Sequence, residues 1–221
     1  MIRTANLDRS AVERVVRDIV RQRLGFDTPQ RPEVVVNISA RHMHITQEDL
    51  ERLFGPGARL TVFRELYQEG QFASEQTVTI IGPRHRTLSN IRILGPTRKA
   101  NQIELSFTDG IAMGIDLPVR MSGDIAGTPG CIVLGPKGHI EMKQGVIRAL
   151  RHAHMNEREA AAYGVGDGDM MNLHVDSDCA LTLEGIVARV DPAMKCEIHL
   201  DTDEGNAAHL TSARGVELYK A

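Results

Sequence analysis

The chain contains one segment twice, and this duplication constrains its fold more than any other feature. The first copy, RHMHITQEDLERLFG, starts at Arg41, and the second, RHAHMNEREAAAYG, starts at Arg151. Each copy has the order R-H-x-H, an apolar residue, a helix-capping residue (Thr46 or Asn156), an acidic residue at the third helical position and a terminating glycine. We therefore expect one structural unit to be used twice.

A second pair of matching segments lies downstream of the first. QIELSFTDG (102–110) resembles EIHLDTDEG (197–205), with Glu104 in the place of His199. A third side chain able to bind a metal is thus repeated together with the histidine pair.

Short β-rich runs dominate the chain from Glu33 onward. Examples are VVVNIS, QTVTIIG, LTLEGIVARV and KCEIHL, separated by turns of Gly, Pro, Asp and Asn. Many brief strands with few, short helices favour β-barrels or sandwiches over a doubly wound α/β sheet. The predicted fold class is mainly β with short α-helices.

The two H-x-H pairs predict two metal sites. In extended backbone, residues i and i+2 face the same way about 7 Å apart, so two imidazoles can reach one ion at roughly 2.0 to 2.1 Å. Each predicted trio leaves a fourth position open, which is typical of a catalytic site. The trios are His42, His44 and Glu104, and His152, His154 and His199. The alternative is that these histidines cap turns or bind backbone carbonyls.

Arg98, in the turn LGPTRKANQIE, is the predicted anion-binding residue. It lies six residues before Glu104, and its planar guanidinium can donate two parallel hydrogen bonds to a phosphate. The alternative is an ordinary surface arginine. Neither a P-loop nor a G-x-G-x-x-G motif after a strand occurs, so a nucleoside triphosphate site is not supported.

The composition limits the class of partner. A formal net charge of −3, no Trp and few other aromatic residues argue against nucleic acid. No apolar run is long enough to cross a membrane, and Cys131, Cys179 and Cys196 form no C-x-x-C pair, which suits reduced thiols. We expect a cytoplasmic protein without a membrane partner.

The segments VNISARHMH, LGPTRKANQIELSFTDG, RHAHM and EIHLDTDEGNA resemble the phosphate propanoyltransferase family, the phosphotransacylases of the propanediol-utilisation type. The resemblance implies exchange of phosphate and coenzyme A on a short acyl group. It also implies two small β-barrels, about 33–40 plus 150–219 and about 41–149, within a catalytic domain of residues 33–221. Two divalent metal ions, zinc in this family, would be held by the two trios. Arg98 would bind phosphate, and Ser39 and Asn206 would lie close to the coenzyme A site.

The predicted mechanism is direct attack of phosphate on the thioester, without an acyl-enzyme. Metal ions and Arg98 would screen the repulsion between the two anionic reactants, and an open metal position suits a thiolate leaving group. Two rival functions remain open. One is a dinuclear metallohydrolase of thioesters or phosphoesters, and the other is a non-catalytic metal-binding scaffold protein.

Residues 1–25 have the three- and four-residue apolar spacing of an amphipathic helix, and 26–32 form a Pro-containing linker. By resemblance, this segment would direct the enzyme into a bacterial microcompartment through its shell proteins. The alternative is a helix packed on the catalytic body or on a second subunit. We expect the protein to form a homodimer.

Overall fold

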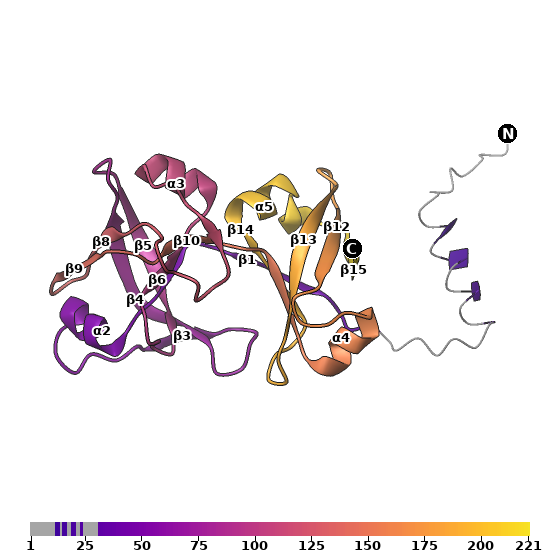
Figure 1. Ribbon diagram of the computed structural model, residues 1–221, viewed down its shortest axis with the longest axis horizontal. Coiled ribbons are helices and arrows are strands. Elements are labelled where there is room, and N and C mark those ends of the chain that lie inside the picture. Colours follow the sequence, from indigo (N-terminus) through magenta and orange to yellow (C-terminus); the bar gives the residue numbers. More distant parts are fainter. Residues whose placement is uncertain (1–11, 14, 17–18, 21–22, 24–30) are drawn as a thin grey trace.

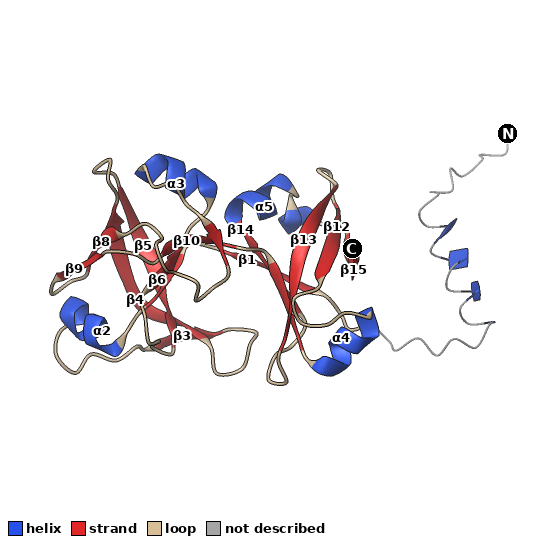
Figure 2. Ribbon diagram, in the orientation of Figure 1, coloured by secondary structure: helices blue, strands red, loops and turns tan. Residues whose placement is uncertain are grey.

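Two strongly curled sheets lie side by side, each forming a half-barrel (Figure 1). The computed structural model describes residues 31–221 and, in the N-terminal segment, residues 12, 13, 15, 16, 19, 20 and 23. Strands dominate and the helices are short (Figure 2). The predicted fold class, mainly β with short helices, is confirmed.

The N-terminal segment is described at only these seven positions, all of which are helical and exposed. Most of the predicted helix (1–25) and linker (26–32) lies outside the described residues.

The C-terminal sheet combines one early strand with the last third of the chain. Its strands, in spatial order, are β1 (Val35–Ser39), β14 (Glu197–Asp201), β11 (His152–Met155), β13 (Leu181–Val190), β12 (Met170–Asp176) and β15 (Gly215–Lys220). Burial alternates along β12, as expected for a strand with one face on the core. The apolar side chains of this face form a core around Met171, Leu173 and Val175.

The N-terminal sheet is built from residues 42–149. Its main path is β7 (Val119–Arg120), β10 (Val146–Ala149), β6 (Gln102–Glu104), β2 (His42–His44), β5 (Thr87–Gly95), β4 (Phe72–Ile81), β8 (Cys131–Leu134) and β9 (His139–Met142), and β3 (Val62–Glu65) pairs with β4. A second core, including Ile80, Ile93 and Ile103, fills this half-barrel. Strands β7 to β10 and β15 were not among the predicted runs.

The two repeated units exchange strands: the strand just before each R-H-x-H motif pairs in the sheet that contains the other motif. β1 precedes β2 in sequence but pairs in parallel with β14 of the C-terminal sheet. β10 precedes β11 but pairs in parallel with β6 of the N-terminal sheet. The chain therefore passes from one sheet to the other immediately before each R-H-x-H motif. The predicted division into barrels 33–40 plus 150–219 and 41–149 stays a prediction.

Each strand that carries predicted ligands is followed directly by a capped helix. The helices are α2 (Gln47–Phe54) after β2, α3 (Phe107–Met113) after β6, α4 (Glu157–Tyr163) after β11 and α5 (Thr202–Ala207) after β14; η1 (Leu210–Ser212) follows α5. The predicted caps are confirmed: Thr46 accepts from the backbone N–H of Asp49, and Asn156 forms a full capping box with Glu159. None of the described helices is long and apolar enough to cross a membrane.

Candidate metal centre and substrate cavity

The N-terminal trio is assembled from two neighbouring antiparallel strands. His42 and His44 lie on one face of β2, and Glu104 of β6 lies directly opposite His42. The carboxylate of Glu104 approaches both rings, with Oε2 3.5 Å from His42 Nε2 and Oε1 4.0 Å from His44 Nε2. One ligand atom from each residue lies within 4.8 Å of the other two. The predicted trio is thus brought together.

The C-terminal trio has the same construction. His152 and His154 lie on β11, and His199 of β14 lies directly opposite His152. His152 Nε2 is 3.2 Å from His154 Nε2, and the rings of His152 and His199 stack with centroids 5.0 Å apart. The three ligand atoms again lie within 4.8 Å of one another.

Backbone carbonyls orient the first histidine of each pair. His42 Nδ1 lies 2.9 Å from Ala40 O, and His152 Nδ1 lies 2.8 Å from Leu150 O. Because a carbonyl can only accept, each Nδ1 carries a proton and donates it to the carbonyl, which turns Nε2 toward the trio. This is the arrangement expected of metal-binding histidines.

The donor chemistry of both trios fits a divalent metal ion. Imidazole nitrogens and a carboxylate are zinc ligands, and a cluster of two buried residues and one half-buried residue otherwise leaves polar atoms unsatisfied. Among the described residues, His154 Nδ1 and His199 Nε2 have no hydrogen-bond partner.

Burial keeps most of these imidazoles neutral. It lowers the pKa of His44 to about 3, with a further contribution from His42. Burial and the neighbouring histidines lower the pKa of His152 to about 4 and that of His154 to about 3. Neutral imidazoles retain the lone pairs that metal binding needs.

His42 and Glu104 behave as an ion pair instead. Burial opposes charge on both groups, but their mutual attraction outweighs it, so the pKa of His42 is raised and the pKa of Glu104 is lowered. A cation is therefore favoured beside Glu104.

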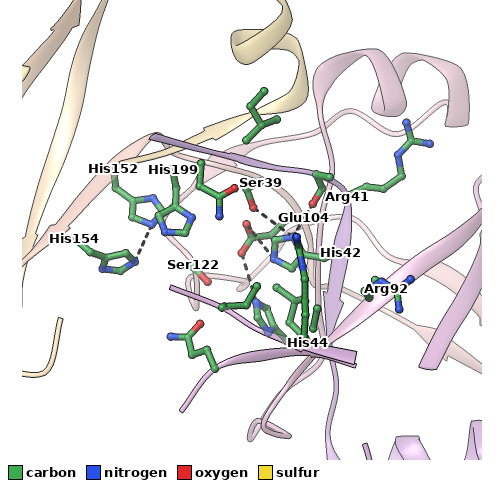
Figure 3. Close-up of a pocket in the computed structure, with 18 of the residues that line it drawn as sticks. Ser39, Arg41, His42, His44, Arg92, Glu104, Ser122, His152, His154 and His199 are labelled. Carbon is green, nitrogen blue, oxygen red and sulfur yellow. Dashed lines mark hydrogen bonds and ion pairs between the residues drawn. The ribbon is translucent and has the colours of Figure 1, made fainter. Parts of the chain in front are cut away.

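Both trios face one cavity of about 660 Å³ between the two sheets (Figure 3). Side chains from β1, β2, β11 and β14 converge on it. Of the described residues that line it, Glu104 is the one carboxylate, whereas five are arginines: Arg41, Arg64, Arg92, Arg98 and Arg189. Such a cavity suits a ligand that carries several negative charges.

Arg98 lies in this cavity as predicted by its spacing from Glu104. Its Nη1 donates to Ser122 Oγ at 3.4 Å, and its backbone N–H donates to Ile45 O at 2.8 Å. Burial lowers the pKa of Arg98. The guanidinium nevertheless stays charged at any working pH. Its assignment to phosphate stays a prediction.

The two remaining predicted residues differ in position. Ser39, at the end of β1, lines the cavity, and its Oγ lies 3.5 Å from His42 Nδ1. Asn206 is exposed on α5 and is not among the residues that line the cavity. Their roles toward coenzyme A stay predictions.

The arginine of each R-H-x-H motif contacts an acid in the helix that follows the third ligand. Arg41 Nη2 lies 3.1 Å from Asp109 Oδ1 at the start of α3, and Arg151 Nε lies 3.4 Å from Glu204 Oε1 at the start of α5. Asp109 and Glu204 occupy matching positions in the second repeated segment. The repeated arginines therefore anchor the repeated unit.

Several cavity residues were missed by the sequence reasoning. Arg189 pairs in register with His154, and Arg92 pairs with His42, but only strand pairing brings them to the site. Gln102, which contacts Glu104 but is not among the residues that line the cavity, did carry a signal. It lies two residues before Glu104 on the same face, and its Nε2 donates to Glu104 Oε1 at 2.7 Å.

Comparison with known proteins agrees with this geometry. The family model described as phosphate propanoyltransferase matches residues 35–211. The phosphate propanoyltransferase of Planctopirus limnophila is 51% identical, over 97% of this chain and 93% of the relative. Those of Thermotoga maritima (46%, over 83% and 87%) and Salmonella typhimurium (40%, over 91% and 93%) are similar over most of their length. The chain belongs to the phosphate propanoyltransferase family, and it is an acyltransferase.

Proposed function

We propose that this enzyme interconverts a short-chain acyl-CoA plus phosphate with an acyl phosphate plus CoA, the acyl group being propanoyl or acetyl. The observation that carries the proposal is the convergence of two metal-ligand trios and Arg98 on one cavity lined by five arginines. The printed names of the relatives support propanoyl as the acyl group.

The two trios would each hold a divalent ion, which we propose to be zinc. When bound, the ions would supply positive charge that screens the repulsion between phosphate and the anionic thioester substrate. The trios leave a face toward the cavity, so substrate can reach both sites.

Arg98 is the proposed phosphate-binding residue. Its contact with Ser122 Oγ at 3.4 Å restricts the guanidinium, so less side-chain entropy is lost when a phosphate binds. The other cavity arginines would face the phosphate groups of coenzyme A, with Ser39 and Asn206 along its path. These side chains would hold the two anions together, which converts a bimolecular encounter into an oriented one.

The proposed reaction is a direct displacement. An oxygen of phosphate attacks the thioester carbonyl carbon, a C–O bond forms, the C–S bond breaks, and the electron pair leaves on the CoA sulfur. Burial raises the pKa of Cys131 and of Cys196 to about 12, so neither is a ready nucleophile. Of the described residues that line the cavity, none is a cysteine.

Phosphate dependence tests the proposal against its main rival. CoA release from propanoyl-CoA should require phosphate and yield propanoyl phosphate in equal amount. Full-rate CoA release without phosphate would establish a thioester hydrolase instead. Bound metal without any turnover would establish the scaffold protein.

We also propose that residues 33–221 are the catalytic domain, that the enzyme is a homodimer, and that residues 1–25 direct it to the shell proteins of a bacterial microcompartment. Removal of residues 1–31 should leave the activity, the dimeric state and the melting temperature unchanged. It should abolish co-purification with shell proteins. A lowered melting temperature would instead indicate a helix that packs on the body.

A further inference from the structure

Glu197 is a buried carboxylate beside the C-terminal trio with no role in the proposed reaction. Its exposed fraction is 2%. It lies two residues before His199 on β14 and directly opposite His154 on β11, so it shares the face that carries the trio. A carboxylate this deeply buried needs partners that offset its desolvation.

Three residues supply those partners. Asn37 Nδ2 donates to Oε1 at 3.2 Å, and Gln68 Nε2 donates to Oε2 at 2.8 Å. The same Oε2 lies 3.0 Å from His199 Nε2, which makes no hydrogen bond. The carboxylate therefore lies between two amide donors and the ring of a metal-ligand histidine.

The partner residues tie Glu197 to both sheets. Asn37 comes from the exchanged strand β1, and Gln68 comes from the connection between β3 and β4 of the N-terminal sheet. The Gln68 amide is itself fixed, since it donates to Lys195 O at 3.0 Å and accepts from Lys195 N at 3.1 Å. The position of the carboxylate is thus determined from three directions.

The duplicated N-terminal site shows what this carboxylate replaces. Opposite His42 and His44 lie Glu104 and Gln102, and opposite His152 and His154 lie His199 and Glu197. Among the residues paired with the histidines, each facing strand therefore carries one carboxylate: Glu104 opposite the first histidine of its motif, and Glu197 opposite the second. In the N-terminal site the third proposed ligand is the carboxylate of Glu104, which accepts a hydrogen bond from the amide of Gln102. In the C-terminal site the third proposed ligand is the imidazole of His199, which lies beside the carboxylate of Glu197.

We propose that Glu197 is a positioning residue of the C-terminal metal site. It holds the ring of His199 in the trio and gives this site the single negative charge that Glu104 gives the other. The inference rests on the proposed function only in taking the trios as metal sites.

The experiment is a zinc competition titration of the full chain against a chromophoric chelator, with Glu197→Gln compared with wild type. The substitution keeps the size of the side chain and removes its charge. One metal equivalent should bind about 10- to 100-fold more weakly, and the other should be unchanged. Glu184→Gln, which removes an exposed carboxylate from β13, should bind both equivalents as wild type does.

A double-mutant cycle assigns the affected site. His199→Ala should weaken the same equivalent, and adding Glu197→Gln to it should cost nothing further. The inference is overturned if Glu197→Gln binds both equivalents normally, if it weakens both equally, or if its effect adds in full to that of His199→Ala. Melting temperatures of the metal-free variants show whether an equal weakening of both sites comes from loss of the fold.

The proposed function is scored separately, by phosphate-dependent CoA release from wild type. If CoA release does not depend on phosphate but Glu197→Gln weakens one metal equivalent alone, the proposed reaction is wrong and the role of Glu197 stands. If wild type bound no second equivalent, both would fall.

Discussion

His152 stacks on His199, donates a hydrogen bond to Leu150 O and pairs with His199 across the strands. Its loss should therefore affect the C-terminal site and leave the N-terminal site unchanged. His152→Ala should remove one metal equivalent and lower kcat by several orders of magnitude, since the C-terminal trio would keep two ligands. Metal analysis and the phosphate-dependent assay measure both effects. His174→Ala is the matched control, because His174 lies on β12 and only its Nδ1 contact with Thr182 is lost. Retention of two equivalents by His152→Ala would contradict the assignment.

Arg98 should act on phosphate more than on coenzyme A. Arg98→Gln removes the charge and the paired donors, and we expect KM for phosphate to rise by about 10- to 100-fold, corresponding to the roughly 1.5 to 3 kcal/mol of a charged hydrogen bond. Steady-state kinetics with each substrate varied in turn would show this. An equal rise in KM for propanoyl-CoA would place Arg98 elsewhere in the cavity. Arg214→Gln, on the surface, should change neither constant.

The sequence reasoning could bring the six proposed ligand residues into two groups because their motifs are short and repeated. The H-x-H spacing and the caps after it are visible within each copy of the motif, whereas Glu104 and His199 emerge only when the distant copies are compared. Glu197 carried the same signal as Gln102, because it lies two residues before a proposed ligand on the same strand. Arg189 carries no such signal, since it reaches the site through pairing with β11, and the register of that pairing depends on the whole sheet.

At the scale of elements, Arg148 joins the exchanged strand β10 to the C-terminal sheet. Its guanidinium contacts the carboxylates of Asp201 and Glu204, and all three side chains are at most 12% exposed. Arg148→Met would remove the arginine that contacts buried Asp201 and would leave Glu204 with Arg151 alone, which should lower the free energy of unfolding by about 3 to 5 kcal/mol. Denaturant unfolding measures the change.

The control for Arg148 is Arg214→Met. Arg214 also contacts two carboxylates, those of Asp176 and Asp178, but all three side chains are more than half exposed. Its loss should cost much less than the loss of Arg148, because water and salt screen an exposed ion pair. Equal effects of the two substitutions would show that burial of the Arg148 cluster has no special weight.

Strand prediction succeeded where alternation was long enough to read. β12 was predicted from the six-residue run MNLHVD and β13 from the ten-residue run LTLEGIVARV. β7 and β10 span two and four residues, and their strand character comes from partners distant in sequence. Local pattern cannot report such a pairing.

For the whole molecule, acid should destabilise the metal-free enzyme before its ordinary carboxylates titrate. The pKa values of His44, His152 and His154 are lowered to between about 3 and 4 in the folded chain, against an ordinary value of 6.5. Between these values the unfolded chain binds more protons, so stability falls as the pH falls from about 6.5 to 4. The raised pKa of His42 acts in the opposite sense, but on one group against three.

Thermal melts of chelator-treated protein between pH 7 and pH 4 measure this loss. His154→Gln cannot take up a proton, so its melting temperature should depend less steeply on pH than that of wild type. A wild-type curve that is flat over this window, or parallel to that of His154→Gln, would contradict the neutral state of the buried imidazoles.

The exchange of β1 and β10 also bears on how the nascent chain matures on the ribosome. The N-terminal sheet can close once residue 149 has emerged, but β1 then waits without its neighbour until β14 has been translated. Because β1 and β14 lie far apart along the chain, their pairing is slow. Until it occurs, the unpaired edge of β1 can associate with strands of other chains. We therefore expect the space between the two sheets to form only after β14 has been translated, rather than by docking of two finished modules.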